Sequence, residues 1–146
     1  MGLFEKILVP VDGSRYSLNA VCMAARLGKM HGSELMIVHV IDESLLDQLA
    51  RFSAKNREAV REELRSSAQG FLIDMRCEAS KELAATTEIQ IKEGVPHEVI
   101  LEEAAQWGAD LIVMGKLGRR GIAHILLGSV AERVIEFSEV PVLVVK

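Results

Sequence analysis

The chain has 146 residues, of which about half are apolar, a quarter are charged and few are aromatic, and its formal net charge is −4. These values are typical of a single globular domain with an aliphatic core, which we expect to span residues 1–146. They argue against nucleic-acid binding, because no basic stretch is interleaved with aromatic residues. The first apolar run, residues 7–9, is too short for a signal peptide or a membrane helix, so we expect a cytoplasmic protein with no membrane partner.

Strand-like and helix-like patterns alternate along the chain. Strands buried on both faces are predicted by the apolar runs 7–9, 35–41, 111–114 and 142–145, the last of them within a fifth strand over 140–145. The alternating run 88–92 predicts an edge strand. Amphipathic periodicity predicts helices over 14–31, 43–85, 96–107 and 129–137, the second of them broken or mobile near the polar run 53–58. This alternation predicts a doubly wound α/β fold with a five-stranded parallel sheet.

Capping residues and cysteines add local expectations. Ser14 is suited to cap the first helix, and Pro96 suits the first turn of the helix that Gly108 ends. Cys22 and Cys77 lie within apolar-periodic segments, so we expect two reduced core thiols. The four histidines show no metal-ligand spacing with one another or with cysteine.

A ligand site is expected where the sheet order reverses. In doubly wound sheets ligands bind beyond the carboxyl ends of the strands at that point. In this chain these ends are Asp12-Gly13-Ser14 after the first strand and the segment from Gly115 onward after the fourth.

The second of these segments is glycine-rich. Gly115 and Gly118 bracket a turn, where glycine permits positive φ and close approach of a ligand to the backbone. After nine intervening residues Gly128-Ser129 opens a helix, whose free amides suit a phosphate. Positive charge comes from three side chains of the loop, Lys116, Arg119 and Arg120. A plain turn followed by a helix cap is the alternative, but the full spacing favours a phosphate site.

The pattern Gly115-x2-Gly118-x9-Gly128-Ser129 resembles the nucleotide motif of the universal stress protein family, in its ATP-binding branch. The opening 6–14 and the closing stretch 128–145 are also similar to that family. The resemblance implies the three-layer α/β/α fold of the adenine-nucleotide alpha hydrolases, with a parallel sheet in the order 3-2-1-4-5.

The resemblance also implies a ligand, ATP, with a divalent cation, Mg²⁺ or Mn²⁺. It assigns the nucleoside to residues after the first, second and fourth strands, which are Pro10, Val11, Asp12, Val40, Met114 and Gly115. It assigns the phosphates to Gly118, Gly128, Ser129 and Val130. Asp12 would take the ribose hydroxyls or the shell of the cation, and Val40 would meet the adenine edge through its backbone. Asp12 as a helix cap, and Val40 and Met114 as plain core, remain compatible alternatives.

Other functions fit less well. A response-regulator receiver needs clustered acids, whereas Asp12 stands alone after the first strand. The motifs of dinucleotide oxidoreductases and of P-loop hydrolases are absent from the sequence. No obvious catalytic base lies near the loop except His124, for which a surface position on the turn is expected. We therefore expect a nucleotide-dependent stress-response module, with slow ATP hydrolysis or phosphotransfer as the alternative.

The last strand predicts self-association. Residues 140–145 carry no charge and would lie at a sheet edge in the implied order. A second copy pairing through this strand would form a two-fold homodimer, as the family resemblance also implies. The alternative is that the segment 43–85 covers the edge. No protein partner can be named from the sequence.

Overall fold

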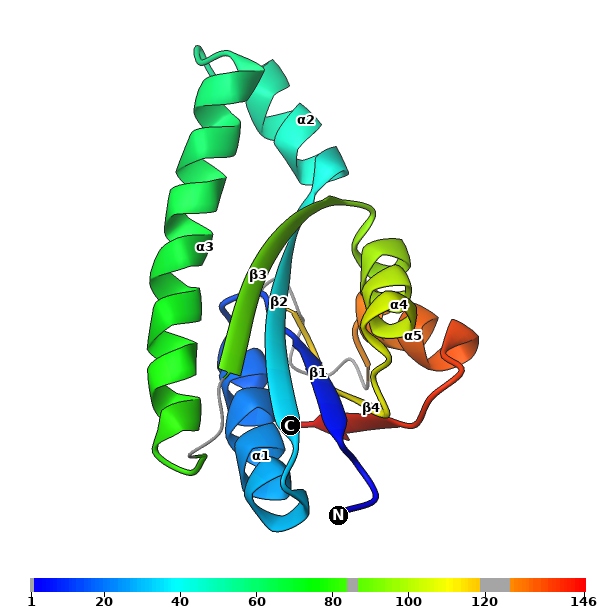
Figure 1. The fold of residues 1–146 in the computed structure, drawn as a ribbon. Helices are drawn as coiled ribbons and strands as arrows, with labels where there is room; N and C mark the ends of the chain where they lie inside the picture. The colour runs from blue at the N-terminus through cyan, green and yellow to red at the C-terminus, as the bar shows by residue number, and fades with distance from the viewer. Residues whose placement is uncertain (1, 84–86, 119–126) are drawn as a thin grey trace.

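A computed structural model describes residues 2–83, 87–118 and 127–146, and it contains one parallel sheet (Figure 1). The strands are β1 (Lys6–Pro10), β2 (Glu34–Asp42), β3 (Thr87–Gly94), β4 (Leu111–Gly115) and β5 (Val142–Val145). Their order in the sheet is β3-β2-β1-β4-β5, and every neighbouring pair is parallel. The predicted doubly wound α/β class and the implied order 3-2-1-4-5 are both confirmed.

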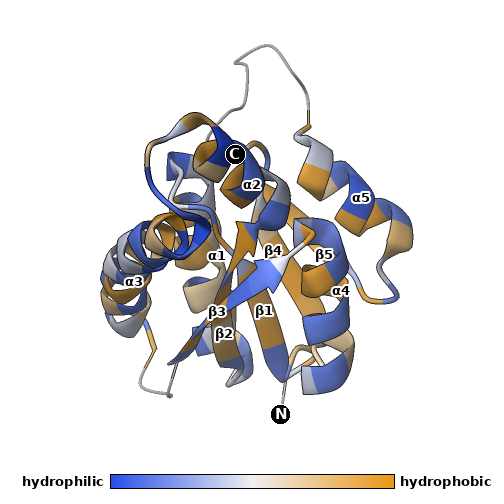
Figure 2. Cartoon of the chain, turned by 90° about the horizontal axis from the view of Figure 1, so that it is seen from above, coloured by the Kyte–Doolittle hydropathy of each residue, from blue (hydrophilic) through white to orange (hydrophobic). Residues whose placement is uncertain are grey.

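Helices cover both faces of the sheet and give three layers (Figures 1 and 2). On one face α1 (Arg15–His31) packs on β1 and β4 and α3 (Arg57–Ser80) on β2 and β3, and on the other face lie α4 (Pro96–Trp107) and α5 (Ser129–Phe137). The short helix α2 (Glu43–Phe52) follows β2 directly and packs against α3. Within the described ranges, no helix combines the length and the apolar character needed to cross a bilayer.

Local capping explains where the helices begin and end. Oγ of Ser14 accepts the N–H of Ser17 at 3.1 Å and starts α1, as predicted. Pro96 lies in the first turn of α4, and Gly108 ends that helix with a φ of 78°. The break expected near 53–58 is confirmed, because Oδ1 of Asn56 accepts the N–H of Ala59 and starts α3 anew.

Two expectations about burial are wrong. Cys22 is only half-buried. Cys77 is exposed, because it faces away from the α3 stripe that contains Met75 and Ala79. The run 142–145 is half-buried rather than buried, and Leu143 is 37% exposed. The strand begins at Val142 rather than at residue 140 and lies at the edge of the sheet, where no strand within residues 2–83, 87–118 and 127–146 pairs with its outer side.

Candidate functional site

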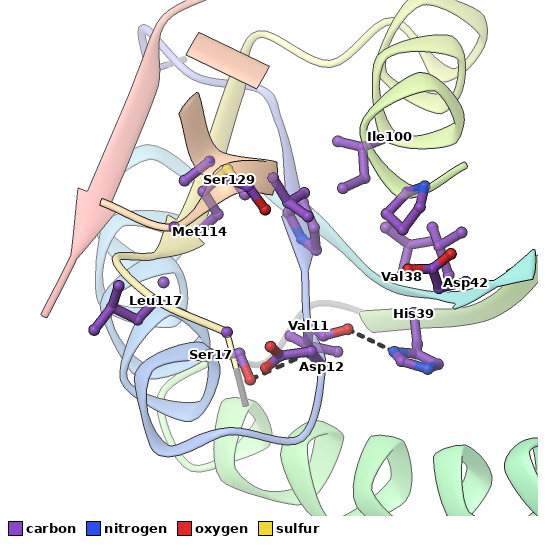
Figure 3. Close-up of a pocket in the computed structure, with 18 of the residues that line it drawn as sticks. Val11, Asp12, Ser17, Val38, His39, Asp42, Ile100, Met114, Leu117 and Ser129 are labelled. Atoms are coloured by element: carbon purple, nitrogen blue, oxygen red, sulfur yellow. Dashed lines mark hydrogen bonds between the residues drawn. The ribbon is translucent and has the colours of Figure 1, made fainter. Parts of the chain in front are cut away.

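A cavity of about 780 Å³ opens at the carboxyl ends of β1 and β4 (Figure 3). It lies where β1 pairs with β2 on one side and with β4 on the other, which is the point where the strand order reverses. All ten residues named from the sequence line it: Pro10, Val11, Asp12, Val40, Met114, Gly115, Gly118, Gly128, Ser129 and Val130. The parallel topology therefore gathers residues more than a hundred positions apart, while their binding of a ligand stays a prediction.

Hydrogen bonds from the start of α1 hold the Asp12 segment in place. Oδ1 of Asp12 accepts the N–H of Ser14 at 3.0 Å, and the Asp12 N–H donates to Oγ of Ser17 at 3.4 Å. Ser17 is 3% exposed, and its hydroxyl donates to the carbonyl of Ser14 at 2.9 Å. Asp12 thus braces the turn while Ser14 caps the helix, and the Asp12 carboxylate lies at the cavity wall (Figure 3).

His39 forms a part of the wall that sequence reasoning missed. Its Nδ1 lies 2.7 Å from the carbonyl oxygen of Val11, and its ring packs edge-on against Phe71 of α3 at 5.0 Å between centroids (Figure 3). Because a carbonyl oxygen only accepts, Nδ1 is the donor in this contact. The sequence did hold a signal for this role, because His39 is a single polar residue inside an apolar strand. Side chains alternate along a strand, so His39 lies on the face opposite Val38 and Val40.

The glycines of the loop let neighbouring groups come close to the backbone, and they do not adopt unusual backbone angles. Gly115, Gly118 and Gly128 all have ordinary φ, so the positive φ that glycine permits is not used at these positions. A Cβ on Gly115 would lie 2.8 Å from the backbone carbon of Tyr16, so the approaching group there is α1 of the same chain. A Cβ on Gly118 would lie 2.8 Å from Oδ2 of Asp12, whereas at Gly128 the nearest atoms are at 3.4 Å.

The start of α5 lies at one end of the cavity. Gly128 is the N-cap residue, and in the part of the chain that the structure describes no side-chain cap hydrogen bond is made to the first amides of this helix. Ser129 is thus the first helical residue and not a side-chain cap, and it lines the cavity (Figure 3). The Gly128 N–H donates to the carbonyl of Lys116 at 2.8 Å, which closes the two described ends of the loop onto each other. Arg119, Arg120 and His124 lie outside the described residues.

The other end of the cavity is apolar. Val38, Val40, Ile100 and Met114 belong to the core cluster between the sheet and α4–α5, and they also line the cavity. Val40 is 8% and Met114 is 5% exposed, so core packing and cavity lining are compatible at both positions. The site therefore runs from an aliphatic slot beside β2 and α4 to the helix start at α5.

Comparison with known proteins identifies the family. The sequence model of the Universal stress protein family matches residues 3–146. The chain belongs to the universal stress protein family. Universal stress protein MJ0531 of Methanocaldococcus jannaschii is 39% identical to it over 144 residues, which cover 99% of this chain and 83% of that relative.

Solved universal stress proteins share the fold as well. Universal stress protein MJ0577 of Methanocaldococcus jannaschii is 33% identical in sequence, and the solved MJ0577 structure has a TM-score of 0.86 at 32% identity, covering 99% of this chain and 96% of that one. A universal stress protein solved in complex with cAMP has a TM-score of 0.67 at 26% identity, covering 97% and 96% of the two chains. The family resemblance read from the glycine motif is thereby confirmed.

Proposed function

We propose that this universal stress protein binds an adenine nucleotide in the cavity, with ATP preferred, and acts as a cytoplasmic, nucleotide-dependent module of the stress response. One observation carries the proposal: the glycine motif, the Asp12 turn and the start of α5 all line one cavity that has an apolar end. The cAMP complex of a family member at 26% identity supports an adenine-containing ligand.

The cavity accounts for each part of such a ligand. An adenine ring fits the aliphatic slot of Val38, Ile100 and Met114, and the backbone of Val40 would read its edge. The phosphates would lie at Gly118 and at the first amides of α5, where the helix dipole favours negative charge.

Asp12 fits the ribose hydroxyls or a divalent cation. A carboxylate is a hard oxygen donor, and Mg²⁺ is often held by one or two carboxylates together with phosphate oxygens and waters. Within the described part of the chain no three His, Cys, Asp or Glu side chains cluster as metal ligands. A cation, Mg²⁺ or Mn²⁺, would therefore arrive with the nucleotide, and it would neutralise phosphate charge beside Asp12.

The geometry favours a binding module over a fast enzyme. Rapid phosphoryl transfer needs a base or nucleophile positioned at the γ-phosphate. The Asp12 carboxylate accepts the Ser14 N–H, and Nδ1 of His39 contacts the Val11 carbonyl, so both groups support the loop. Slow ATP hydrolysis remains the second candidate. Incubation of pure protein with radiolabelled ATP distinguishes a binding module from an enzyme. We expect less than one turnover per minute, and many turnovers per minute would contradict the proposal of a binding module.

The ligand itself can be identified without choosing it in advance. Freshly purified protein is denatured, and the released small molecules are identified by mass spectrometry. We expect an adenine nucleotide close to stoichiometric with the protein. Release of a guanine nucleotide or of an unrelated metabolite would contradict the proposal.

We further propose that the module is a homodimer through β5. The apolar residues of this edge strand are half-exposed in the single chain, and Leu143 is 37% exposed. Ile135 and Phe137 of α5 are also exposed, at 45% and 54%. The alternative was that the segment 43–85 covers the β5 edge. It is contradicted, because α2 and α3 of this segment pack on β2 and β3, near the other edge of the sheet.

A further inference from the structure

The second edge of the sheet is open along β3. Among the described residues this strand pairs with β2 alone, and no strand of that part of the chain lies on its other side. Its charged side chains lie on the α4 face or at its ends, as the ion pair between Lys92 and Glu103 of α4 shows. On the opposite face Ile89 and Ile91 are only partly buried against the α1–α3 cluster. The edge therefore offers unpaired backbone groups beside an apolar surface.

Helix α3 runs alongside this edge (Figure 1), and side chains of the two elements line a groove. The groove has a volume of about 460 Å³ and lies outside the nucleotide cavity. Ile89 and Ile91 form its strand side, and Ile73, which is 47% exposed, lies on its helix side. The groove thus has both apolar and polar side chains in its lining, and it is open along the edge of β3.

Two arginines mark the ends of the groove. Arg65 and Arg76 line it from α3, with Gln69 between them. Neighbouring cations are neutralised, as Arg61 pairs with Glu58 and with Glu93 of β3. Across the described ranges neither Arg65 nor Arg76 forms an ion pair. In a chain of net charge −4, the groove therefore carries two uncompensated positive charges.

The spacing of these charges suits an extended chain. Eleven residues of helix span about 16 Å. In an extended strand, side chains on one face recur every second residue, so two carboxylates four residues apart are separated by about 13 Å. Flexible arginine side chains cover the remaining difference. A residue midway between the two carboxylates would face the apolar side chains at the centre of the groove.

We propose that β3 and α3 form a docking groove for an extended acidic segment of a partner protein. The segment adds to β3 as a sixth strand and has the pattern acid-x-apolar-x-acid. Its backbone pairs with the open edge, its carboxylates bind Arg65 and Arg76, and its apolar residue packs between Ile73 and Ile91. This surface is separate from the nucleotide cavity, so the proposal does not depend on the proposed function.

The side-chain part is tested by fluorescence anisotropy of the full chain with a labelled peptide, Ser-Thr-Glu-Thr-Val-Thr-Glu-Thr-Ser. We expect saturable binding that weakens about tenfold or more when both glutamates of the peptide are glutamine. Arg65→Gln and Arg76→Gln should each weaken binding about threefold to tenfold. The control Arg133→Gln, on α5 at the other face of the sheet, should leave it unchanged. Equal binding of the glutamate and glutamine peptides would overturn the proposal.

The strand-addition part needs a backbone test. Two peptides with the same side chains carry N-methyl groups on alternate residues, one on the odd and one on the even positions. In a paired strand only one of these sets of N–H groups faces β3, so we expect one peptide to lose binding and the other to keep it. Equal behaviour of the two peptides would overturn strand addition. A dimer of the parent that Ile73→Glu dissociates would show that a second copy fills the groove, and would also overturn the proposal.

Discussion

A Cβ placed on Gly118 would lie 2.8 Å from Oδ2 of Asp12, so the loop after β4 lies directly against the carboxylate after β1. The two residues belong to the two strand ends on either side of the point where the sheet order reverses. Close approach here brings the segments assigned to the ribose and to the phosphates within reach of one ligand.

The contact makes Gly118→Ala the sharpest test of the loop. The new methyl group meets the end of a short side chain, so the Asp12 carboxylate can rotate away and the fold should be kept. The rotated carboxylate no longer faces the ribose or the cation, and we expect the affinity for ATP to fall about tenfold, or about 1.4 kcal/mol. Calorimetric titration measures the affinity and circular dichroism the fold. Unchanged affinity would mean that this contact has no part in binding.

A matched glycine provides the control. Gly70 lies in α3, and a Cβ there would meet nothing within 4 Å. We expect Gly70→Ala to leave ATP affinity unchanged and to raise the free energy of unfolding by about 0.5–1 kcal/mol, because alanine has less conformational freedom to lose in a helix. Denaturant unfolding measures this gain.

Alanine substitutions at the other two loop glycines, Gly115 and Gly128, should have different effects, on stability at the first and on ATP binding at the second. At Gly115 a methyl group would meet the backbone of Tyr16 at 2.8 Å, and backbone cannot rotate away. We expect Gly115→Ala to lower the free energy of unfolding by about 1–3 kcal/mol. At Gly128 the nearest atoms are at 3.4 Å, so Gly128→Ala should keep the fold and weaken ATP binding through the space left for phosphate. Thermal unfolding of the two variants tests the contrast, and equal losses of stability would contradict it.

Cys22 should react slowly with alkylating reagents at neutral pH. Burial raises the pKa of its thiol, and the negative charge of Glu78 raises it further. Because a raised pKa leaves less thiolate at a given pH, the alkylation rate should rise only at pH values above those that suffice for free cysteine. Glu78→Gln should shift this profile toward lower pH. Peptide mass spectrometry after timed iodoacetamide labelling across pH gives the profile, and one that matches free cysteine would refute this prediction.

Charge placed on β5 should abolish the proposed dimer. Val142→Glu together with Val144→Lys puts charges on the half-buried edge strand, where pairing with a second copy would bury them. We expect light scattering to show a dimer for the parent and a folded monomer for the variant. Gln90→Glu on β3, at the opposite edge, should remain dimeric. A monomeric parent at micromolar concentration would exclude the β5 interface.

The element order and the place of the site follow from local sequence patterns. Apolar runs, Ser14 and Pro96 all depend on neighbours in the chain, and the structure has the expected element order and the expected starts of α1 and α4. His39 and Ser17 were missed because their roles depend on partners brought near by folding, the carbonyl of Val11 and the turn at Asp12.

Burial and the purpose of each glycine were harder to predict for the same reason. An apolar run such as 142–145 does not reveal whether both of its sides have neighbours. Gly115 and Gly118 look alike in the sequence, yet one faces the backbone of α1 and the other lies directly against the Asp12 carboxylate. Only the packed arrangement of β1, β4 and α1 distinguishes them.

The most direct test of the central claim is calorimetric titration of the pure, nucleotide-free protein with ATP and with GTP in the presence of Mg²⁺. The backbone of Val40 and the aliphatic slot beside it should accept adenine, so we predict one ATP per chain with an affinity at least about tenfold higher than that for GTP. Equal affinities for the two nucleotides, or no binding of either, would contradict the claim that this cavity is an adenine-nucleotide site.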